Sequence, residues 1–230
     1  MAGKNLEILK IAAVKLRPVL EELVFIGGSI IELFITDKAA MDIRETKDVD
    51  VIVETLTYSG YINFTDRLKK IGFSEDTRED APICRWVNDG TTLDVMPIGG
   101  QILGFTNKWY KSAFTNFDIV KIDPEIKIKV VRPEYFIATK IEAFKGRGEN
   151  DYYASHDLED ILAVIDGRQE FLDELCLANA DIRNEISSFI NECLNNESFL
   201  NALPGHLPLG NNGQGRFAFL LDRLSKLSQV

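Results

Sequence analysis

Residues 25–53 constrain the fold of this chain more than any other segment. A short apolar run ends in the turn Gly27-Gly28-Ser29, and a second apolar run carries the alternating sequence Asp48-Val49-Asp50. Short runs that are rich in valine and isoleucine and bounded by turn residues are typical of β-strands. Because side chains alternate across a strand, Asp48 and Asp50 are predicted to share one face, with the valines on the other. The segment therefore predicts two strands, the first of which ends in a tight glycine turn.

The bulk composition is that of a globular protein with an acidic surface. The chain has 230 residues, of which 45% are hydrophobic, and its mean hydropathy is −0.06, so it can bury an ordinary core. Its net charge is −10 and its pI is about 4.8. Proteins that coat nucleic acid are basic because they neutralise phosphates, so this charge argues against a broad nucleic-acid surface. A local basic pocket for a nucleotide stays compatible with it.

The cysteines and the N-terminal stretch favour a cytoplasmic protein. Cys84, Cys176 and Cys193 match neither a metal-binding spacing nor a disulfide framework, and they are predicted to be reduced, buried thiols. With only two histidines, a histidine-rich metal site is excluded. The amphipathic N-terminus is interrupted by Lys10 and Lys15, and no apolar run approaches the roughly 18 residues of a membrane-spanning helix. We therefore expect no export and no membrane contact.

Hydrophobic periodicity and turn signals predict the other elements of the chain. Strands are predicted over residues 24–26, 48–54, 83–87, 91–98, 118–121 and 127–131. Helices are predicted over residues 5–23, 30–35, 61–71, 133–145, 157–165, 169–178, 181–195 and 216–227, with a loop over 203–215. Ser29 is predicted to cap the helix that begins at Ile30, with Glu32 completing a capping box. The pair Asp89-Gly90 is predicted to form a hairpin turn.

This order of elements predicts a mixed α+β protein. A small mixed β-sheet core flanked by helices is expected over residues 1–132, and an all-α helical region over residues 133–230. No flexible linker separates the two halves, so we expect the C-terminal helical domain to pack on the α/β core.

Three strand-borne carboxylates form the chemically informative set. Asp48 and Asp50 share a strand face, and Asp94 lies centrally in a later apolar strand. Carboxylates placed together repel one another unless a cation lies between them. Mg²⁺ prefers oxygen ligands, often a few carboxylates together with substrate phosphates, so a two-metal phosphoryl-transfer site is one interpretation. The alternative is a solvated or salt-bridged pair, with Arg44 or Lys47 as the partner, beside an ordinary glycine turn.

The order of these residues resembles a known signature. Gly27-Gly28-Ser29, Asp48-Val49-Asp50 and Asp94 resemble the nucleotidyltransferase superfamily that includes DNA polymerase beta. Residues 44–50, Arg-Glu-Thr-Lys-Asp-Val-Asp, resemble a motif of the AbiEii-type toxin-like nucleotidyltransferases, and so do residues 133–140 and 156–161. The resemblance covers roughly residues 25–165. One departure is the long spacer of residues 30–47 between Ser29 and Asp48, which is expected to reshape the nucleotide pocket.

The resemblance implies a role for each matching residue. The Gly27-Gly28-Ser29 turn would hold the β- and γ-phosphates through backbone amides and the Ser29 hydroxyl. Asp48, Asp50 and Asp94 would be the catalytic residues and would bind Mg²⁺, with Mn²⁺ as an alternative ion. Asp94 would also help activate the attacking hydroxyl.

Three further residues are implied as nucleotide contacts, each with a structural alternative. Lys140 would neutralise triphosphate charge, or would only extend its ammonium to solvent. Asp157 would orient Lys140 or contact the nucleotide, or would be a helix N-cap. Arg44 would contact the nucleotide, or would be an ion-pair partner of Asp48 or Asp50. Arg147, in the break after the helix over 133–145, is predicted to be solvated, with a position facing the triphosphate as the alternative.

Two functions of different classes follow. The first is an active enzyme that moves a nucleoside monophosphate from a nucleoside triphosphate to an acceptor hydroxyl on an RNA end such as tRNA, a protein or a small molecule. The resemblance implies that such an enzyme could be a toxin with an antitoxin partner. The second is a catalytically weak or inactive nucleotide-binding module of the same fold. Three mutually repelling carboxylates argue for the enzyme, because a module without turnover has no evident reason to keep them.

Overall fold

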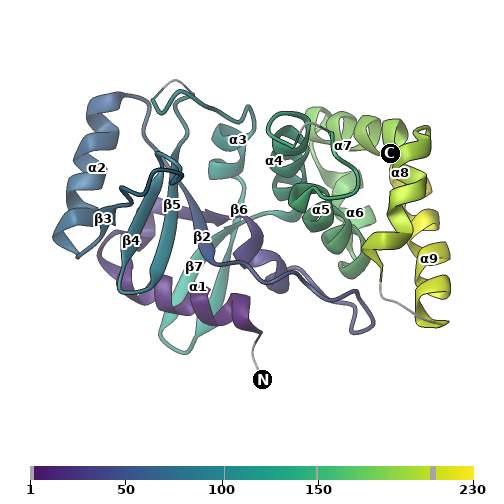
Figure 1. Cartoon of the computed structure of the whole chain (residues 1–230), viewed down its shortest axis with the longest axis horizontal. Helices are drawn as coiled ribbons and strands as arrows, with labels where there is room; N and C mark the ends of the chain where they lie inside the picture. The colour runs from purple at the N-terminus through teal and green to yellow at the C-terminus, as the bar shows by residue number, and fades with distance from the viewer. Residues whose placement is uncertain (1–2, 101, 149, 208–210) are drawn as a thin grey trace. The chain divides into compact units, whose positions relative to one another are not determined.

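The computed structural model describes residues 3–100, 102–148, 150–207 and 211–230 (Figure 1), and the side chains of residues 211–214 are not described. The chain forms two compact units. The sheet unit consists of the residues up to Leu33 together with Glu45–Arg132, and the helical unit consists of Phe34–Arg44 together with Pro133–Val230. These units differ from the predicted domains 1–132 and 133–230 by the segment Phe34–Arg44, which lies within the long spacer after Ser29.

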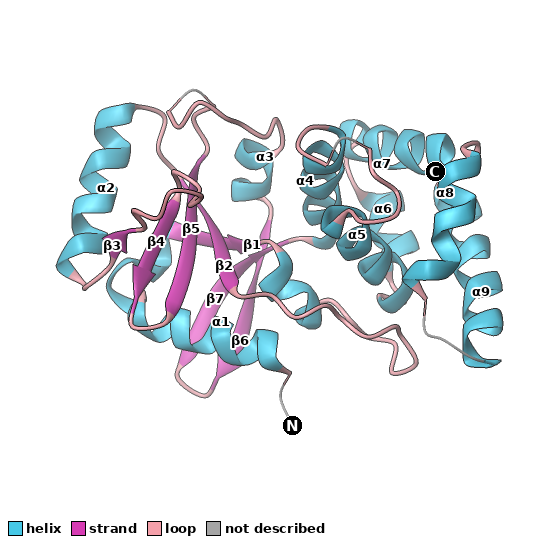
Figure 2. Cartoon of the chain, viewed as in Figure 1, coloured by secondary structure: helices cyan, strands magenta, loops and turns pink. Residues whose placement is uncertain are grey.

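The sheet unit is built on a mixed sheet. Its described residues form seven strands in the order β3-β4-β5-β2-β1-β7-β6 (Figure 2). The strands are β1 Leu23–Ile26, β2 Asp48–Val53, β3 Ser74–Glu75, β4 Arg85–Asn88, β5 Thr91–Pro97, β6 Phe117–Asp123 and β7 Ile126–Val131. The pairs β2–β5 and β1–β7 are parallel, and the other neighbouring pairs are antiparallel. The predicted mixed α/β class with C-terminal helices is confirmed.

The central strands follow directly from local sequence. Val49 and Val51 of β2 are buried, whereas Asp48 and Asp50 are partly exposed, which is the alternation that the sequence predicted. The hairpin between β4 and β5 turns at Asp89 and Gly90, whose φ angles are 40° and 76°. Positive φ at both central positions is the type I′ requirement that an Asp-Gly pair meets. The predicted hairpin is therefore confirmed.

The predicted helix over residues 5–23 is wrong in its second half. The helix α1 spans Lys4–Lys15, and a separate 3₁₀ helix, η1, spans Arg17–Glu22. Pro18 has no N–H for an α-helical bond to Val14, and its ring disfavours the helical conformation in the preceding residue, so the α-helix ends before it. Helix α1 packs on strands β2, β5, β6 and β7. The other α-helices of the sheet unit are α2 Tyr58–Lys70 and α3 Tyr110–Thr115, and α3 was not predicted.

The capping box predicted at Ser29 and Glu32 is also wrong. Residues Gly28–Leu33 form a short 3₁₀ helix, η2, rather than the start of an α-helix. The Glu32 carboxylate accepts a hydrogen bond from the Gly3 amide at 2.9 Å, so it is used by the start of α1. A long-range partner has replaced the local one that the sequence pattern favoured.

The helical unit contains α4 Pro133–Lys145, α5 His156–Gly167, α6 Phe171–Leu177, α7 Ala180–Leu194, α8 Glu197–Ala202, η3 Leu203–His206 and α9 Asn211–Leu227. Pro133 begins α4 as predicted, because a helix needs no N–H at its first position. The predicted loop over 203–215 is wrong where η3 and the first turns of α9 lie, and its residues 208–210 are outside the described residues. Helix α8, capped by Asn196, was not predicted.

The segment Phe34–Arg44 is held by the helical unit through backbone and side-chain contacts. The amides of Thr36 and Asp37 both donate to the Gly167 carbonyl at the end of α5, each at 2.9 Å. Arg216 of α9 pairs with Asp37 at 2.8 Å and with the fully buried Asp166 at 2.5 Å. The spacer after Ser29 therefore supplies a structural part of the helical unit.

The thiol prediction is confirmed for two of the three cysteines. Cys84 and Cys193 are buried and unbonded, and burial raises the pKa of each thiol to about 12. Cys176 is exposed, so the prediction that it is buried is wrong. None of the helices in the described ranges is both long enough and apolar enough to cross a membrane.

Candidate functional site

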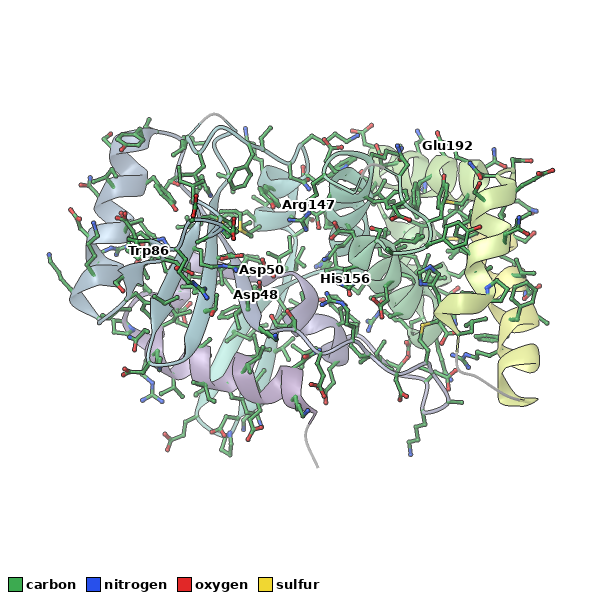
Figure 3. All side chains as sticks on the ribbon, viewed as in Figure 1. Asp48, Asp50, Trp86, Arg147, His156 and Glu192 are labelled. Carbon is green, nitrogen blue, oxygen red and sulfur yellow. The ribbon has the colours of Figure 1, made fainter. Side chains whose placement is uncertain are left out.

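The three predicted carboxylates lie on neighbouring strands of the sheet unit. Strand β2 pairs in parallel with β5, and the register sets Asp50 directly opposite Asp94 and Asp48 opposite Thr92. Residues opposite each other in a sheet project from the same face, so Asp94 joins Asp48 and Asp50 there. Figure 3 labels Asp48 and Asp50, which project from β2. Sequence spacing alone predicted the pair on β2, and the strand register adds the third carboxylate.

Arg85, which the sequence interpretation missed, bridges two of these carboxylates. Its Nε donates to Asp94 Oδ1 at 2.8 Å, and its Nη2 lies 2.7 Å from both Asp94 Oδ2 and Asp48 Oδ2. The hairpin register places Arg85 of β4 opposite Asp94 of β5. The hydrogen bonds to Asp94, together with the nearby charges of Asp94 and Asp48, raise the pKa of Arg85 above its ordinary value. Counting outward from the predicted Asp89-Gly90 turn would have found this pair.

The glycine turn lies close to the carboxylate of Asp50. Strand β1 ends opposite Asp50, because Ile26 is its register partner. Gly27 follows with φ of +78°, and a Cβ atom built on it would lie only 1.9 Å from Asp50 Oδ2. A side chain at this position would thus be strained and would collide with the Asp50 carboxylate. The turn and Asp50 form one packed arrangement.

Ser29 carries a polar group that the described protein atoms leave unsatisfied. The residue is fully buried, and its Oγ has no hydrogen-bond partner among the described residues. A buried hydroxyl without a partner costs about 1–3 kcal/mol, so such groups usually mark a ligand, ion or water position. The hydroxyl therefore fits the expected role in binding a phosphate oxygen.

The carboxylates fit a hard cation in their chemistry but not in their present arrangement. Mg²⁺ takes carboxylate oxygens at about 2.0–2.1 Å in a near-octahedral set. Among the described residues, no group of three or more His, Cys, Asp or Glu side chains is arranged so that it could hold a metal ion. Two of the three carboxylates point at Arg85, and Asp50 lies against Gly27.

Replacing Gly27 with alanine is expected to destabilise the protein by about 2–5 kcal/mol. A left-handed backbone costs a non-glycine residue about 1–2 kcal/mol, and overpacking against Asp50 adds about 1–3 kcal/mol. Gly90→Ala is the matched control, because Gly90 has φ of +76° and open space around its Cβ position. Urea unfolding of both variants checks the prediction. Equal losses in the two variants would mean that Asp50 moves aside without cost.

The three outer residues predicted to contact the nucleotide gather in the helical unit. Lys140 of α4 is buried, and its Nζ lies 3.0 Å from Asp157 Oδ1 and 2.7 Å from Asp160 Oδ2. Arg44 Nη2 lies 3.5 Å from Asp160 Oδ1. Arg147 donates to both oxygens of Asp157. These five residues form an ion-pair network within the helical unit.

Several structural alternatives for these residues are corrected by the network. Ser155, not Asp157, caps α5, because its hydroxyl accepts from the Leu158 amide. Arg44 pairs with Asp160 at 3.5 Å and with Glu159 at 3.6 Å. The ammonium group of Lys140 does not extend to solvent.

Two more features of the network concern charge. The Arg147 side chain is 75% exposed, as predicted, yet it is also an ion-pair partner of Asp157. Burial alone would raise the pKa of Asp157, but the charges of Lys140 and Arg147 and their hydrogen bonds outweigh it and lower that pKa below its ordinary value. Asp157 is therefore held in its charged form.

A separate pocket in the helical unit has a volume of about 470 Å³. It is lined by Met41, Asp42, Tyr153, Ala154, Ser155, His156, Glu159, Gly205, His206 and Leu207. Both histidines of the chain lie there: His156 Nδ1 is 3.3 Å from Glu159 Oε2, and His206 Nε2 is 2.8 Å from the Tyr152 carbonyl oxygen. Nothing in the sequence interpretation pointed to this pocket.

Comparisons with known proteins concern the fold. No family model matches the sequence, and no curated protein matches it. The solved structure of JHP933 from Helicobacter pylori is similar, with a TM-score of 0.52 and 11% identity over 100% of this chain and 94% of that chain. At 11% identity, the likeness to JHP933 shows a common fold and carries no activity with it.

Two further solved structures have lower TM-scores. An antigenic nucleotidyltransferase-like protein from Paracoccidioides brasiliensis has a TM-score of 0.47 and 18% identity over 86% of this chain and 93% of that chain. A protein from H. pylori proposed to be a nucleotidyltransferase has a TM-score of 0.49 and 10% identity over 100% of this chain and 96% of that chain. Proteins described as nucleotidyltransferases or nucleotidyltransferase-like thus stand among the structural neighbours, and none of the three is described as AbiEii-type.

Proposed function

We propose that this protein is a metal-dependent nucleotidyltransferase. The observation that carries the proposal is the register of β2 and β5, which sets Asp50 opposite Asp94 with Asp48 on the same face. The glycine turn that abuts Asp50 also carries the buried, unpartnered Ser29 hydroxyl. One chemistry explains both features, because a metal–triphosphate complex needs carboxylates for the metal and donors for the phosphates.

In the proposed reaction, an acceptor hydroxyl oxygen attacks the α-phosphorus of a nucleoside triphosphate. The bond from that phosphorus to the bridging α–β oxygen breaks, pyrophosphate leaves, and the acceptor proton passes to a base. Ser29 Oγ and the backbone amides of the turn would donate to phosphate oxygens. Asp48, Asp50 and Asp94 would hold Mg²⁺ or Mn²⁺, which supplies charge neutralisation and a more acidic hydroxyl when bound. Asp94 would also help activate the attacking hydroxyl.

The class of acceptor is proposed from the net charge of the chain and from the family resemblance of its motifs. A net charge of −10 disfavours a broad nucleic-acid footprint, so an RNA acceptor such as a tRNA end would be contacted over a small area. A protein hydroxyl or a small molecule fits the charge equally well. A toxin role with an antitoxin partner rests on the AbiEii-type resemblance. Arg44, Lys140 and Asp157 are proposed as nucleotide contacts on the basis of the resemblance, and each also has an ionic partner in the helical unit.

One observation favours the second function, a nucleotide-binding module without turnover. Arg85 offsets one of the two negative charges of Asp48 and Asp94 within the chain, so these carboxylates repel each other less even without a metal ion. A protein without turnover can therefore keep these carboxylates together. Such a module would bind a triphosphate at the turn and release it unchanged.

A label-transfer assay tests the proposal. The protein is incubated with each α-labelled nucleoside triphosphate, Mg²⁺ and total tRNA or a cell lysate, and compared with the double variant Asp48→Ala/Asp50→Ala. We expect transfer of label to one acceptor class, and its loss in the double variant. Transfer that survives the double substitution would contradict the assignment of the carboxylates. Tight nucleotide binding without transfer would favour the module.

A further inference from the structure

Arg85 and one hydroxyl contact all four carboxylate oxygens of Asp48 and Asp94. Both oxygens of Asp94 and Oδ2 of Asp48 accept from the guanidinium at 2.7–2.8 Å. The remaining oxygen, Asp48 Oδ1, accepts from the Thr46 hydroxyl at 2.7 Å. A divalent cation that bridges Asp48 and Asp94 would bind oxygens to which Arg85 already donates, and its charge would repel the guanidinium beside it. The guanidinium and the metal therefore compete for the same place.

The ion pairs of Arg85 with Asp94 and Asp48 are strong enough to oppose metal binding. The side chains of Arg85, Asp94 and Asp48 are 20%, 10% and 31% exposed, so solvent screens these charges only in part. Hydrogen bonds between a guanidinium and carboxylates are charge-assisted, and the two-pronged contact with Asp94 adds geometric specificity. Arginine keeps its charge at any working pH, so the competition does not switch off by deprotonation.

We propose that Arg85 is a displaceable internal cation that occupies the metal position between Asp48 and Asp94 until a metal–nucleotide complex arrives. This inference rests on the proposed function and adds a gating residue to it. Guanidinium groups bind phosphate oxygens as readily as carboxylates. A nucleotide therefore brings both a competing cation and a new anionic partner for Arg85. The metal ion alone brings only the competitor, so it binds weakly in the absence of nucleotide.

Mn²⁺ binding, measured by the loss of its free electron paramagnetic resonance signal, tests this proposal without any turnover. We expect Arg85→Gln to bind Mn²⁺ at least tenfold more tightly than the unchanged protein does. We also expect a non-hydrolysable nucleoside triphosphate analogue to strengthen Mn²⁺ binding in the unchanged protein more than in the variant. Arg78→Gln is the matched control, because Arg78 is exposed and pairs with Asp76 two residues away. Its Mn²⁺ affinity should equal that of the unchanged protein.

Arg85→Lys provides a second variant if the glutamine variant unfolds. Lysine keeps the charge but lacks the planar guanidinium. The Mn²⁺ affinity of Arg85→Lys should therefore lie between those of the unchanged protein and Arg85→Gln. A folded Arg85→Gln or Arg85→Lys protein with unchanged or weaker Mn²⁺ binding would overturn the proposal. If label transfer still depends on the three aspartates in that case, the proposed function stands while the gating role fails. Tighter Mn²⁺ binding in Arg85→Gln without transfer in any variant would establish the competition and count against the enzyme.

Discussion

Replacing Asp50 with asparagine is expected to lower the rate of nucleotidyl transfer by at least about a thousandfold. The substitution keeps the shape of the side chain beside Gly27 and removes one negative charge from the set that would hold the metal ion. A thousandfold loss corresponds to about 4 kcal/mol of transition-state stabilisation, within the several kcal/mol that a metal ion supplies in such reactions. Initial rates of label transfer at saturating nucleotide measure the effect.

The control for Asp50→Asn is Asp118→Asn. Asp118 lies on β6 of the same sheet, and its salt bridge with Arg132 is exposed at 3.4 Å. Exposed pairs of this kind contribute about 0–1 kcal/mol to stability, so the control should fold and transfer label normally. If Asp50→Asn retained more than a tenth of the transfer rate while remaining folded, Asp50 would not be a metal ligand in the reaction.

Replacing Lys140 with methionine is expected to destabilise the protein by about 3 kcal/mol. Methionine fills a similar volume, but Asp157 and Asp160 then lose the ammonium that lies between them. Breaking a buried ion pair by removing one partner costs about 3–5 kcal/mol. The lower end is expected because Arg147 still donates to Asp157 and Arg44 still lies near Asp160. Equilibrium unfolding in urea at neutral pH measures the loss.

The destabilisation by Lys140→Met should shrink in acid. The folded protein lowers the pKa of Asp157, so this group contributes stability above its unfolded pKa of about 3.9 and loses it as the pH falls through the folded value. Below about pH 4 the charged carboxylate that needs Lys140 is disappearing, so the two proteins should converge.

Lys145→Met is the control that separates the loss of the buried ion pairs of Lys140 from the loss of a lysine at an exposed position. Lys145 is 37% exposed, and its contacts with Glu185 and Glu192 are 3.5 and 3.7 Å long. Such a pair contributes under about 1 kcal/mol. A loss below about 1 kcal/mol in Lys140→Met, coupled with lost nucleotide binding, would instead favour a direct contact between Lys140 and the triphosphate.

Local patterns were sufficient for the part of the site that lies within single elements. The alternation in Asp48-Val49-Asp50 predicted which residues face the site, and the Asp89-Gly90 pair predicted the hairpin. Both depend on neighbours one or two residues away, which is the range over which side-chain alternation and turn geometry act.

The features that sequence reasoning missed depend on distant partners. Arg85 of β4 reaches Asp48 of β2 across the intervening strand β5, and the spacing in the chain gives no sign of that contact. The position of Glu32 predicted a local capping box, yet its carboxylate accepts a hydrogen bond from the amide of Gly3, 29 residues away. Lys140 and Asp157 resembled a motif in sequence, but the sequence did not predict their ion pair with each other or that of Lys140 with Asp160. In each case a long-range electrostatic contact decided between roles that the local sequence left open.

The placement of Phe34–Arg44 interleaves the two units along the chain. The helical unit is made of two segments that lie on either side of the 88 residues Glu45–Arg132 in the sequence. These 88 residues of the sheet unit are therefore inserted between the two segments of the helical unit. A fragment that begins at Pro133 would leave the Gly167 carbonyl without the amides of Thr36 and Asp37. The ring of Phe136 would lose Phe34, which packs edge-on at 5.3 Å. A cut after Arg132 therefore keeps the sheet unit whole but divides the helical unit, so the helical unit cannot be produced as one continuous fragment without the 88 intervening residues.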